Sequence, residues 1–274
     1  FKNKKFRRRQ PVKVVATGSG DPAERNAQFE FIAAERERHL ASGHPVLSVD
    51  TKKKEFLGGL HRGGSLYTKD VPLGRYDHDF PHLAGGKVVP HGIYDIGANS
   101  GFITLGNSAE TPEFVGRCLR RWWDMRGRYD YAGCREVLLL LDSGGANAAR
   151  SHQFKLEMLQ LAARTGLIFQ VAHYPPYCSK WNPIEHRLFP HVTRSIGGIY
   201  LDSAETVATC IGERCKTSTG LRARAYVFDR EFGTGRKTAE TVPEGFPIVR
   251  SDTLPSWNYT CYPSNKYMIL QYLN

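Results

Sequence analysis

Apolar residues in this chain fall either into short unbroken runs or into segments where they recur every three or four positions. The unbroken runs are PVLSVD at residues 45–50, VLLLLD at 137–142 and LIFQVA at 167–172. Runs of this length, rich in branched aliphatic side chains, are typical of strands buried on both faces of a sheet. Because segments of helical spacing separate them, the pattern predicts an α/β fold with a mixed sheet flanked by helices.

Four helices are predicted from N-cap signals, at Asp21, Thr111, Ser151 and the pair Asp202-Ser203. The helix after Ser151 joins the predicted strands 137–142 and 167–172. A strand, helix, strand unit of this length implies a right-handed parallel crossover. Residues 87–96 and 101–105 are expected to form two strands joined by a hairpin turn.

Two of the buried runs end on an acid, Asp50 and Asp142. A carboxylate inside such a run would carry a large desolvation cost, whereas at the strand end it can reach a cleft and meet a cation. A third acid, Glu185, follows a proline-rich turn that leads out of the strand at 167–172. Converging carboxylates from three separate elements would form a site for a divalent metal ion.

Glu185 has a second interpretation. Asn182 is a preferred N-cap residue, Pro183 suits the first helical position, and Glu185 falls three residues after the cap. This is also the spacing of a capping box, in which the Glu185 side chain would only reach back to the Asn182 N–H. The predicted helix, which we expect to continue through Leu188 and Phe189, therefore carries either a ligand or a cap.

The segments around these acids, residues 46–55, 140–147 and 175–186, carry a resemblance to a known family. They resemble, in order, the three acidic motifs of bacterial insertion-sequence DDE transposases. The branch that they resemble most is the Rhodopirellula-type transposase DDE domain, a relative of the mariner group, whose last motif also has the form Pro, Ser, Asn-Pro-x-Glu. Three shorter segments agree as well, HDFP at 78–81, RRWW at 120–123 and WNY at 257–259, and the similarity runs from about Gln28 to Tyr259.

The resemblance implies an RNase H-like fold and a division of the chain. Residues 21–259 would form the catalytic domain. Residues 1–20 would be a basic arm, or the remnant of a missing N-terminal DNA-binding part, since the chain does not begin with methionine. Residues 260–274 would be an atypical tail.

The resemblance also implies an activity, that of a DNA transposase or polynucleotidyl transferase. In the family, the site first uses water to cut DNA at the transposon end and then uses the freed 3′-OH to attack target DNA. Two Mg²⁺ or Mn²⁺ ions serve this chemistry, and Asp50, Asp142 and Glu185 match the positions that bind them. Asp50 is the expected bridging ligand because it would lie on the central strand.

Charge supports a nucleic-acid partner. Lys and Arg number 38 against 27 Asp and Glu, which gives a net charge of +11, and such an excess favours polyanions. Transposon ends and target DNA are the expected partners, with a homodimer as a further expectation. Four lysines near the acids are candidates for phosphate contacts, Lys52, Lys53, Lys54 and Lys180.

Composition excludes several other classes. The six cysteines include no Cys-x-x-Cys pair, which predicts reduced thiols in a cytosol. No apolar run approaches the length of a membrane span and no secretory signal is visible, so we expect a cytoplasmic protein. The family resemblance adds the expectation that it is bacterial and nucleoid-associated. His78, Asp79 and His82 lie in an irregular region where histidines are more often surface residues than zinc ligands.

Three rival interpretations involve the same motifs. Asp142-Ser143-Gly144-Gly145 matches the surroundings of a serine-protease nucleophile, but the four leucines before it predict a buried parallel strand unlike that fold. A catalytically silent DNA-binding remnant of a transposase would keep the basic charge without the chemistry. Another RNase H-like nuclease would differ in its substrate alone.

Overall fold

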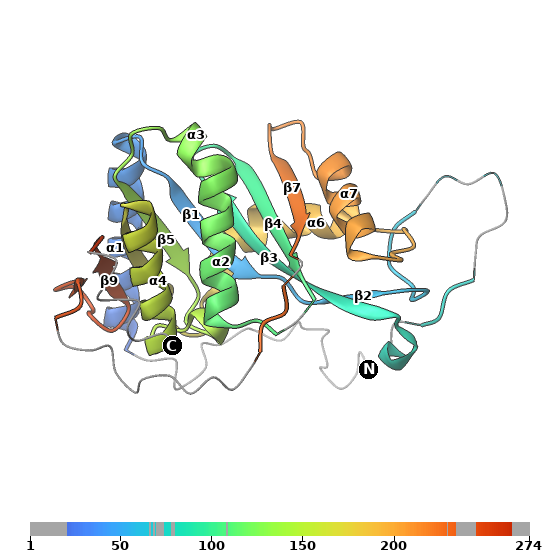
Figure 1. Ribbon diagram of the computed structural model, residues 1–274, viewed down its shortest axis with the longest axis horizontal. Helices are drawn as coiled ribbons and strands as arrows, with labels where there is room; N and C mark the ends of the chain where they lie inside the picture. Colours follow the sequence, from blue (N-terminus) through green and yellow to red (C-terminus); the bar gives the residue numbers. More distant parts are fainter. Residues whose placement is uncertain are drawn as a thin grey trace, which may run out of the picture.

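The computed structural model describes residues 21–65, 67, 69, 74–77, 80–107, 109–228, 230–233 and 245–264. The basic segment 1–20, His78, Asp79 and most of the predicted tail lie outside the described residues. The described chain forms a nine-stranded mixed sheet with helices on both faces (Figure 1). None of its helices is long and apolar enough to cross a membrane.

Five strands form the centre of the sheet, in the spatial order β4 (Ser100–Gly106), β3 (Gly86–Asp95), β1 (Val46–Thr51), β5 (Glu136–Leu141) and β6 (Ile168–His173). The first three are antiparallel to one another, whereas β5 runs parallel to β1 and β6 runs parallel to β5. The β3–β4 hairpin and the parallel crossover are as predicted. This order with these directions is the RNase H-like arrangement, so the predicted fold class is confirmed.

Four further strands extend the sheet: β2 (Glu55–Leu57), β7 (Arg222–Val227), β8 (Ile248–Arg250) and β9 (Asn258–Cys261). β2 pairs with β3, and β7 runs parallel to β4 at one edge. At the other edge, β9 is antiparallel to β6 and carries β8. Strand β9 passes the predicted domain boundary at residue 259, and Cys261 is fully buried.

Alternate residues of the central strands serve two separate cores. On β5, Val137, Leu139 and Leu141 face the cluster that contains α2 (Pro112–Trp122) and α4 (His152–Thr165). Leu138 and Leu140 face α1 (Pro22–Ala41) on the opposite side. The near-continuous leucine run is therefore buried on both faces, as a parallel strand between two helix layers must be.

A third cluster covers the β3–β4 part of the sheet with α5 (Pro183–Arg187), α6 (Phe189–Ser195) and α7 (Ala204–Arg214). The expected single helix through Leu188 and Phe189 is wrong, because α5 ends at Arg187 and α6 starts anew at Phe189. Leu188 leaves helical geometry, with φ −121° and ψ −55°. Pro190 supplies the reason, since a proline belongs in the first turn of a helix and breaks a longer one.

Helix α2 is followed by a π-helical turn (Trp123–Gly127) and a short α3 (Arg128–Asp130). The short η2 (Pro81–Leu83), η4 (Gly145–Asn147) and η5 (Ser179–Trp181) are single 3₁₀ turns. Turn η4 follows Asp142, and turn η5 precedes Glu185.

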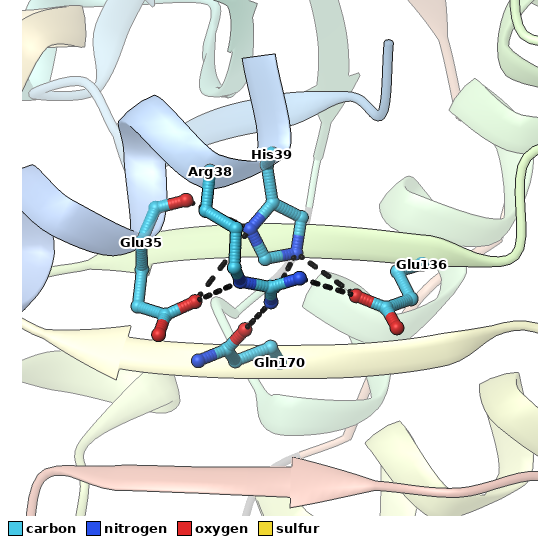
Figure 2. Close-up of polar contacts among 5 residues, drawn as sticks. All are labelled: Glu35, Arg38, His39, Glu136 and Gln170. Atoms are coloured by element: carbon cyan, nitrogen blue, oxygen red, sulfur yellow. Dashed lines mark hydrogen bonds and ion pairs between the residues drawn. The ribbon is translucent and has the colours of Figure 1, made fainter. Parts of the chain in front are cut away.

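The last turn of α1 is fixed to the sheet by the polar cluster drawn in Figure 2. Arg38 donates to Glu35 and Gln170 at 2.8 Å and to Glu136 at 3.1 Å. The His39 ring is fully buried beside them, and burial lowers its pKa. Since Glu136 begins β5, this cluster holds α1 at the end of the strand opposite to Asp142.

The other end of α1 is tied to the last strand. Gln28 Nε2 donates to the His173 carbonyl at 2.8 Å and to Asn258 Oδ1 at 2.7 Å, and Asn258 Nδ2 returns a bond to Gln28 Oε1 at 2.6 Å. All three residues are buried. These bonds place α1, β6 and β9 in one rigid unit.

All six cysteines lie within the described residues and none is in a disulfide.

Candidate active site

Asp50 and Asp142 lie side by side because of strand register. β1 and β5 pair in parallel with Val49 opposite Leu141, so the next residue on each strand is an aspartate. Both residues are partly buried at the carboxyl ends of central strands, where open α/β sheets place their ligands.

Glu185 reaches the same place through contacts made by the residues before it. Asn182 is fully buried; its Oδ1 accepts from Ser48 Oγ and its Nδ2 donates to the Val49 carbonyl at 3.2 Å. The Ile184 N–H donates to Ser48 Oγ at 2.9 Å. Strand β1 therefore holds the start of α5 two residues from Asp50.

The capping-box interpretation of Glu185 is wrong. Asn182 is the N-cap residue but makes no side-chain capping bond, and its own N–H donates to the Ser179 carbonyl at 2.8 Å. Ser48, from a different element, caps Ile184 in its place. The Glu185 carboxyl instead lies near Asp50, where it contributes to raising the pKa of the Asp50 carboxyl.

The two aspartates have raised pKa values because of their burial and their acidic neighbours. Burial, the charge of Asp142 and contact with Glu185 together raise the pKa of Asp50 to about 8, against a weaker opposing bond from the Thr51 N–H. Burial raises the pKa of Asp142 to about 6, with further contributions from Glu110 and Glu185. Two acids with pKa values this high, in one cleft, form an arrangement that favours protons or metal cations.

Asp142 also has an atom without a partner. Its Oδ1 is buried and, within the described structure, accepts no hydrogen bond. A buried carboxylate oxygen left unpaired is costly unless a cation or water completes it. At the same time, no group of three or more acidic, histidine or cysteine side chains among the described residues has ready-made ion-binding geometry. The acids lie close together without forming a closed cage of ligands.

Glu110, which the sequence interpretation missed, is a fourth acid beside this cleft. It is an exposed residue directly before the N-cap of α2, and partial burial of its carboxyl raises its pKa. A Cβ placed on Gly145 would lie 3.7 Å from Glu110 Oε1, so this carboxylate borders the turn after Asp142. No local signal marks Glu110, since it follows no strand and begins no motif.

The predicted phosphate contacts differ among themselves. Lys52 is only 11% exposed and forms an ion pair with Glu55. Lys53 and Lys54 are exposed. Lys180 is also exposed, and its Nζ lies 5.4 Å from the centre of the Trp181 ring.

The serine-protease interpretation finds no support in the geometry. Ser143 Oγ donates to the Tyr174 carbonyl, and the nearby His173 Nδ1 contacts the Asp142 carbonyl at 2.9 Å. The hydroxyl is thus bound to backbone rather than to a base.

Comparison with known proteins gives one family match and several structural ones. The family described as the Rhodopirellula transposase DDE domain matches residues 1–263. No curated protein matches the chain. Among solved structures, the Mos1 transposase paired-end complex with left transposon end is 15% identical, covers 75% of this chain and 58% of that chain, and has a TM-score of 0.45.

Two related structures give similar values. The Mos1 mariner paired-end complex with Mn is 15% identical over 75% of this chain and 59% of that chain, with a TM-score of 0.45. The Mos1 strand transfer complex is 17% identical, covers 75% of this chain and 58% of that chain, and has a TM-score of 0.43. The chain therefore spans less than two thirds of the length of these proteins.

Proposed function

The chain belongs to the Rhodopirellula transposase DDE domain family, and on that premise we propose that it cuts and joins DNA strands by metal-dependent phosphoryl transfer at Asp50, Asp142 and Glu185. The observation that carries the proposal is the position of Asp50. It is next to Asp142 by strand register and near Glu185, and both of these acids contribute to raising its pKa. Transposon ends and target DNA are the proposed substrates, and a second copy of the chain is a proposed partner.

The residues present suit Mg²⁺ or Mn²⁺. All of the donors are carboxylate oxygens, which these hard cations prefer. The buried, unpartnered Oδ1 of Asp142 is a donor atom that no protein group uses in the described structure. When bound, a pair of such ions activates the attacking oxygen and stabilises the leaving oxygen.

The chain's own residues have distinct roles in this proposal. Asp50, whose pKa is raised by both neighbouring acids, would be the shared ligand, and its proton must leave before it can bind a cation. Asp142 and Glu185 would each supply a further carboxylate ligand for one of the two ions. Gly145, at φ +64°, lets the backbone turn sharply after Asp142. Lys53, Lys54 and Lys180 would contact phosphates, while Lys52 is already neutralised by Glu55.

The test is Mg²⁺- or Mn²⁺-dependent nicking of DNA carrying the native element's ends, with any upstream portion restored. Glu185→Gln should lower the rate by several orders of magnitude because it removes a charge from a site for two dications. Glu205→Gln is a matched control, since Glu205 also lies in the first turn of a helix but is exposed on α7. Equal nicking by wild type and Glu185→Gln would refute the role of Glu185.

The remnant interpretation makes the opposite prediction for wild type. A silent DNA-binding remnant would bind DNA without nicking it under any of these conditions. Family membership and the complete set of acids argue against it.

A further inference from the structure

A pocket of about 450 Å³ lies between α1 and the turn that leads into α5, the helix that carries Glu185. It is lined by Arg25, Asn26, Phe29, Cys178, Lys180 and Trp181. Its volume falls in the range of about 300–1,000 Å³ that is usual for ligand sites. No part of the proposed catalytic chemistry uses it.

The pocket is connected rigidly to Glu185. Trp181 ends η5 and is followed by Asn182, the buried residue bonded to Ser48 and Val49 of β1. On the other side, Phe29 is one residue from Gln28, which is bonded to β6 and β9. A ligand in the pocket would therefore be held at a fixed position relative to the carboxylates.

The lining combines open aromatic surface with positive charge. Trp181 is 57% exposed, although the Phe29 ring packs edge-on against it at 6.2 Å. An indole ring with this much open surface can serve as a stacking face for a flat aromatic ligand. Arg25 and Lys180 flank it, and neither forms an ion pair with any described residue.

Tyr177, in the same turn, is a second unusual aromatic. It is 85% exposed and has φ +63°, a backbone conformation that is uncommon for a residue other than glycine. Such strain persists only where the surroundings impose it, and it gathers at functional sites. The turn thus presents two aromatic side chains to solvent beside the acid cleft.

We propose that this pocket binds an unpaired nucleobase of the DNA strand at the cleavage site, with Trp181 as the stacking surface and Arg25 and Lys180 on the adjoining phosphates. This proposal rests on the proposed function, because DNA cleavage at the acids is what would bring a DNA strand to the pocket. A nucleotide is the ligand class that offers both a flat aromatic face and an adjacent anion. A base inside a duplex has no free face, so the pocket selects frayed or single-stranded DNA over a closed duplex.

Equilibrium binding without metal tests this selection. The 274-residue chain is titrated against a labelled blunt duplex and against the same duplex with three unpaired nucleotides at one end. We expect the second to bind about 5- to 100-fold more tightly, the range that stacking of one base gives. Trp181→Ala should abolish this preference, keep blunt-duplex binding and keep the thermal stability, whereas Trp181→Phe should retain most of the preference.

Tyr129→Ala is the matched control. Tyr129 is likewise an exposed aromatic, 64% exposed, with the Arg128 guanidinium 4.6 Å from its ring centre, but it is on α3 and does not line the pocket. This variant should bind both DNAs as wild type does. Loss of the preference in Tyr129→Ala as well would show a general effect of surface aromatics and would overturn the proposal.

A spectroscopic readout locates the base directly. 2-Aminopurine placed in the unpaired stretch should lose fluorescence on binding to wild type and keep it on binding to Trp181→Ala. An equal preference for the two DNAs by wild type, or unchanged quenching by Trp181→Ala, would refute the pocket. If Trp181→Ala instead changed self-association alone, the surface would contact protein, which also refutes it. Since no metal is present, the result stands apart from the nicking assay, whose failure would leave a base-binding protein without catalysis.

Discussion

Ser48 and Asn182 are 134 residues apart in sequence, yet the Ser48 hydroxyl is bonded to the Asn182 side chain and caps the helix that carries Glu185. One hydroxyl on β1 thereby fixes the third acid against the strand that carries the first. The position of Glu185 and the stability of the first turn of α5 therefore depend on the same two hydrogen bonds, from Ser48 to Asn182 and from Ile184 to Ser48.

Ser48→Ala should therefore affect both stability and activity. It removes a buried donor and acceptor and leaves Asn182 and the Ile184 N–H unsatisfied, which should cost about 1–3 kcal/mol of unfolding free energy in urea titrations. Nicking should fall more than stability alone explains. Ser203→Ala is the control, because Ser203 caps the remote α7 by accepting from the Thr206 N–H at 3.1 Å. Its loss should cost about 1 kcal/mol and leave nicking unchanged; equal nicking losses in both variants would contradict the positioning role of Ser48.

Asp50→Asn should stabilise the metal-free protein at alkaline pH. The folded-state pKa of Asp50 is raised to about 8, above the value of about 3.9 in an unfolded chain. The folded state therefore binds the extra proton, and the stability it contributes is complete below pH 4 and is lost as the pH rises to about 8. At pH 9 the variant should exceed wild type by about 1–4 kcal/mol, and the two should converge near pH 4. Thermal melts in EDTA measure this, with the exposed Asp252→Asn as control; a pH-independent difference would contradict it.

Metal binding should release protons. Near pH 7 the Asp50 carboxyl is mostly protonated in the metal-free protein, and a cation can bind only the ionised form. Calorimetric titration of Mn²⁺ in buffers of different ionisation enthalpy should show about one proton released per protein at pH 7 and fewer at pH 9. The Asp142→Asn variant should bind Mn²⁺ more weakly than wild type. Adding Mn²⁺ should therefore raise the melting temperature of the variant less than that of wild type. Identical heats in all buffers would argue against Asp50 as a ligand.

DNA binding should depend on salt, and the lysines after β1 should contribute unequally. If six or more phosphates are contacted, affinity should fall by about 10³-fold or more between 50 and 200 mM salt. The double change Lys53→Ala and Lys54→Ala should reduce the slope of log K against log salt by about 2. Lys52→Ala should change it little, because Glu55 already pairs with Lys52. A flat response to salt would remove the argument for phosphate contacts.

The sequence predicted the parts of the site that depend on local pattern. Unbroken apolar runs located β1 and β5, and parallel pairing of such runs was sufficient to bring Asp50 and Asp142 together. Glu185 could not be interpreted in the same way, because the residue that caps its helix is on a strand more than a hundred positions earlier. A helix start capped by its own Asn and Glu and one capped by a residue from a distant strand have the same local sequence.

Glu110 shows a second limit of local pattern. Its position beside Asp142 results from how the loop before α2 meets the turn at Gly145. Loop conformation follows from packing of the helices it joins, and no periodicity encodes it. Pro190, by contrast, was visible in the sequence and accounts for the break between α5 and α6.

The pairing of β9 with β6 has a consequence for the order in which the protein is made. Asn258 exchanges hydrogen bonds with Gln28, which also donates to the His173 carbonyl, so this buried group is complete only once residue 258 has been made, 230 positions after Gln28. Until then the β6 edge is open and the turn toward Glu185 has no partner strand behind it. The support behind the turn that leads to Glu185 therefore comes from a segment made well after the three acids, so a nascent chain carries Asp50, Asp142 and Glu185 before β9 can brace β6.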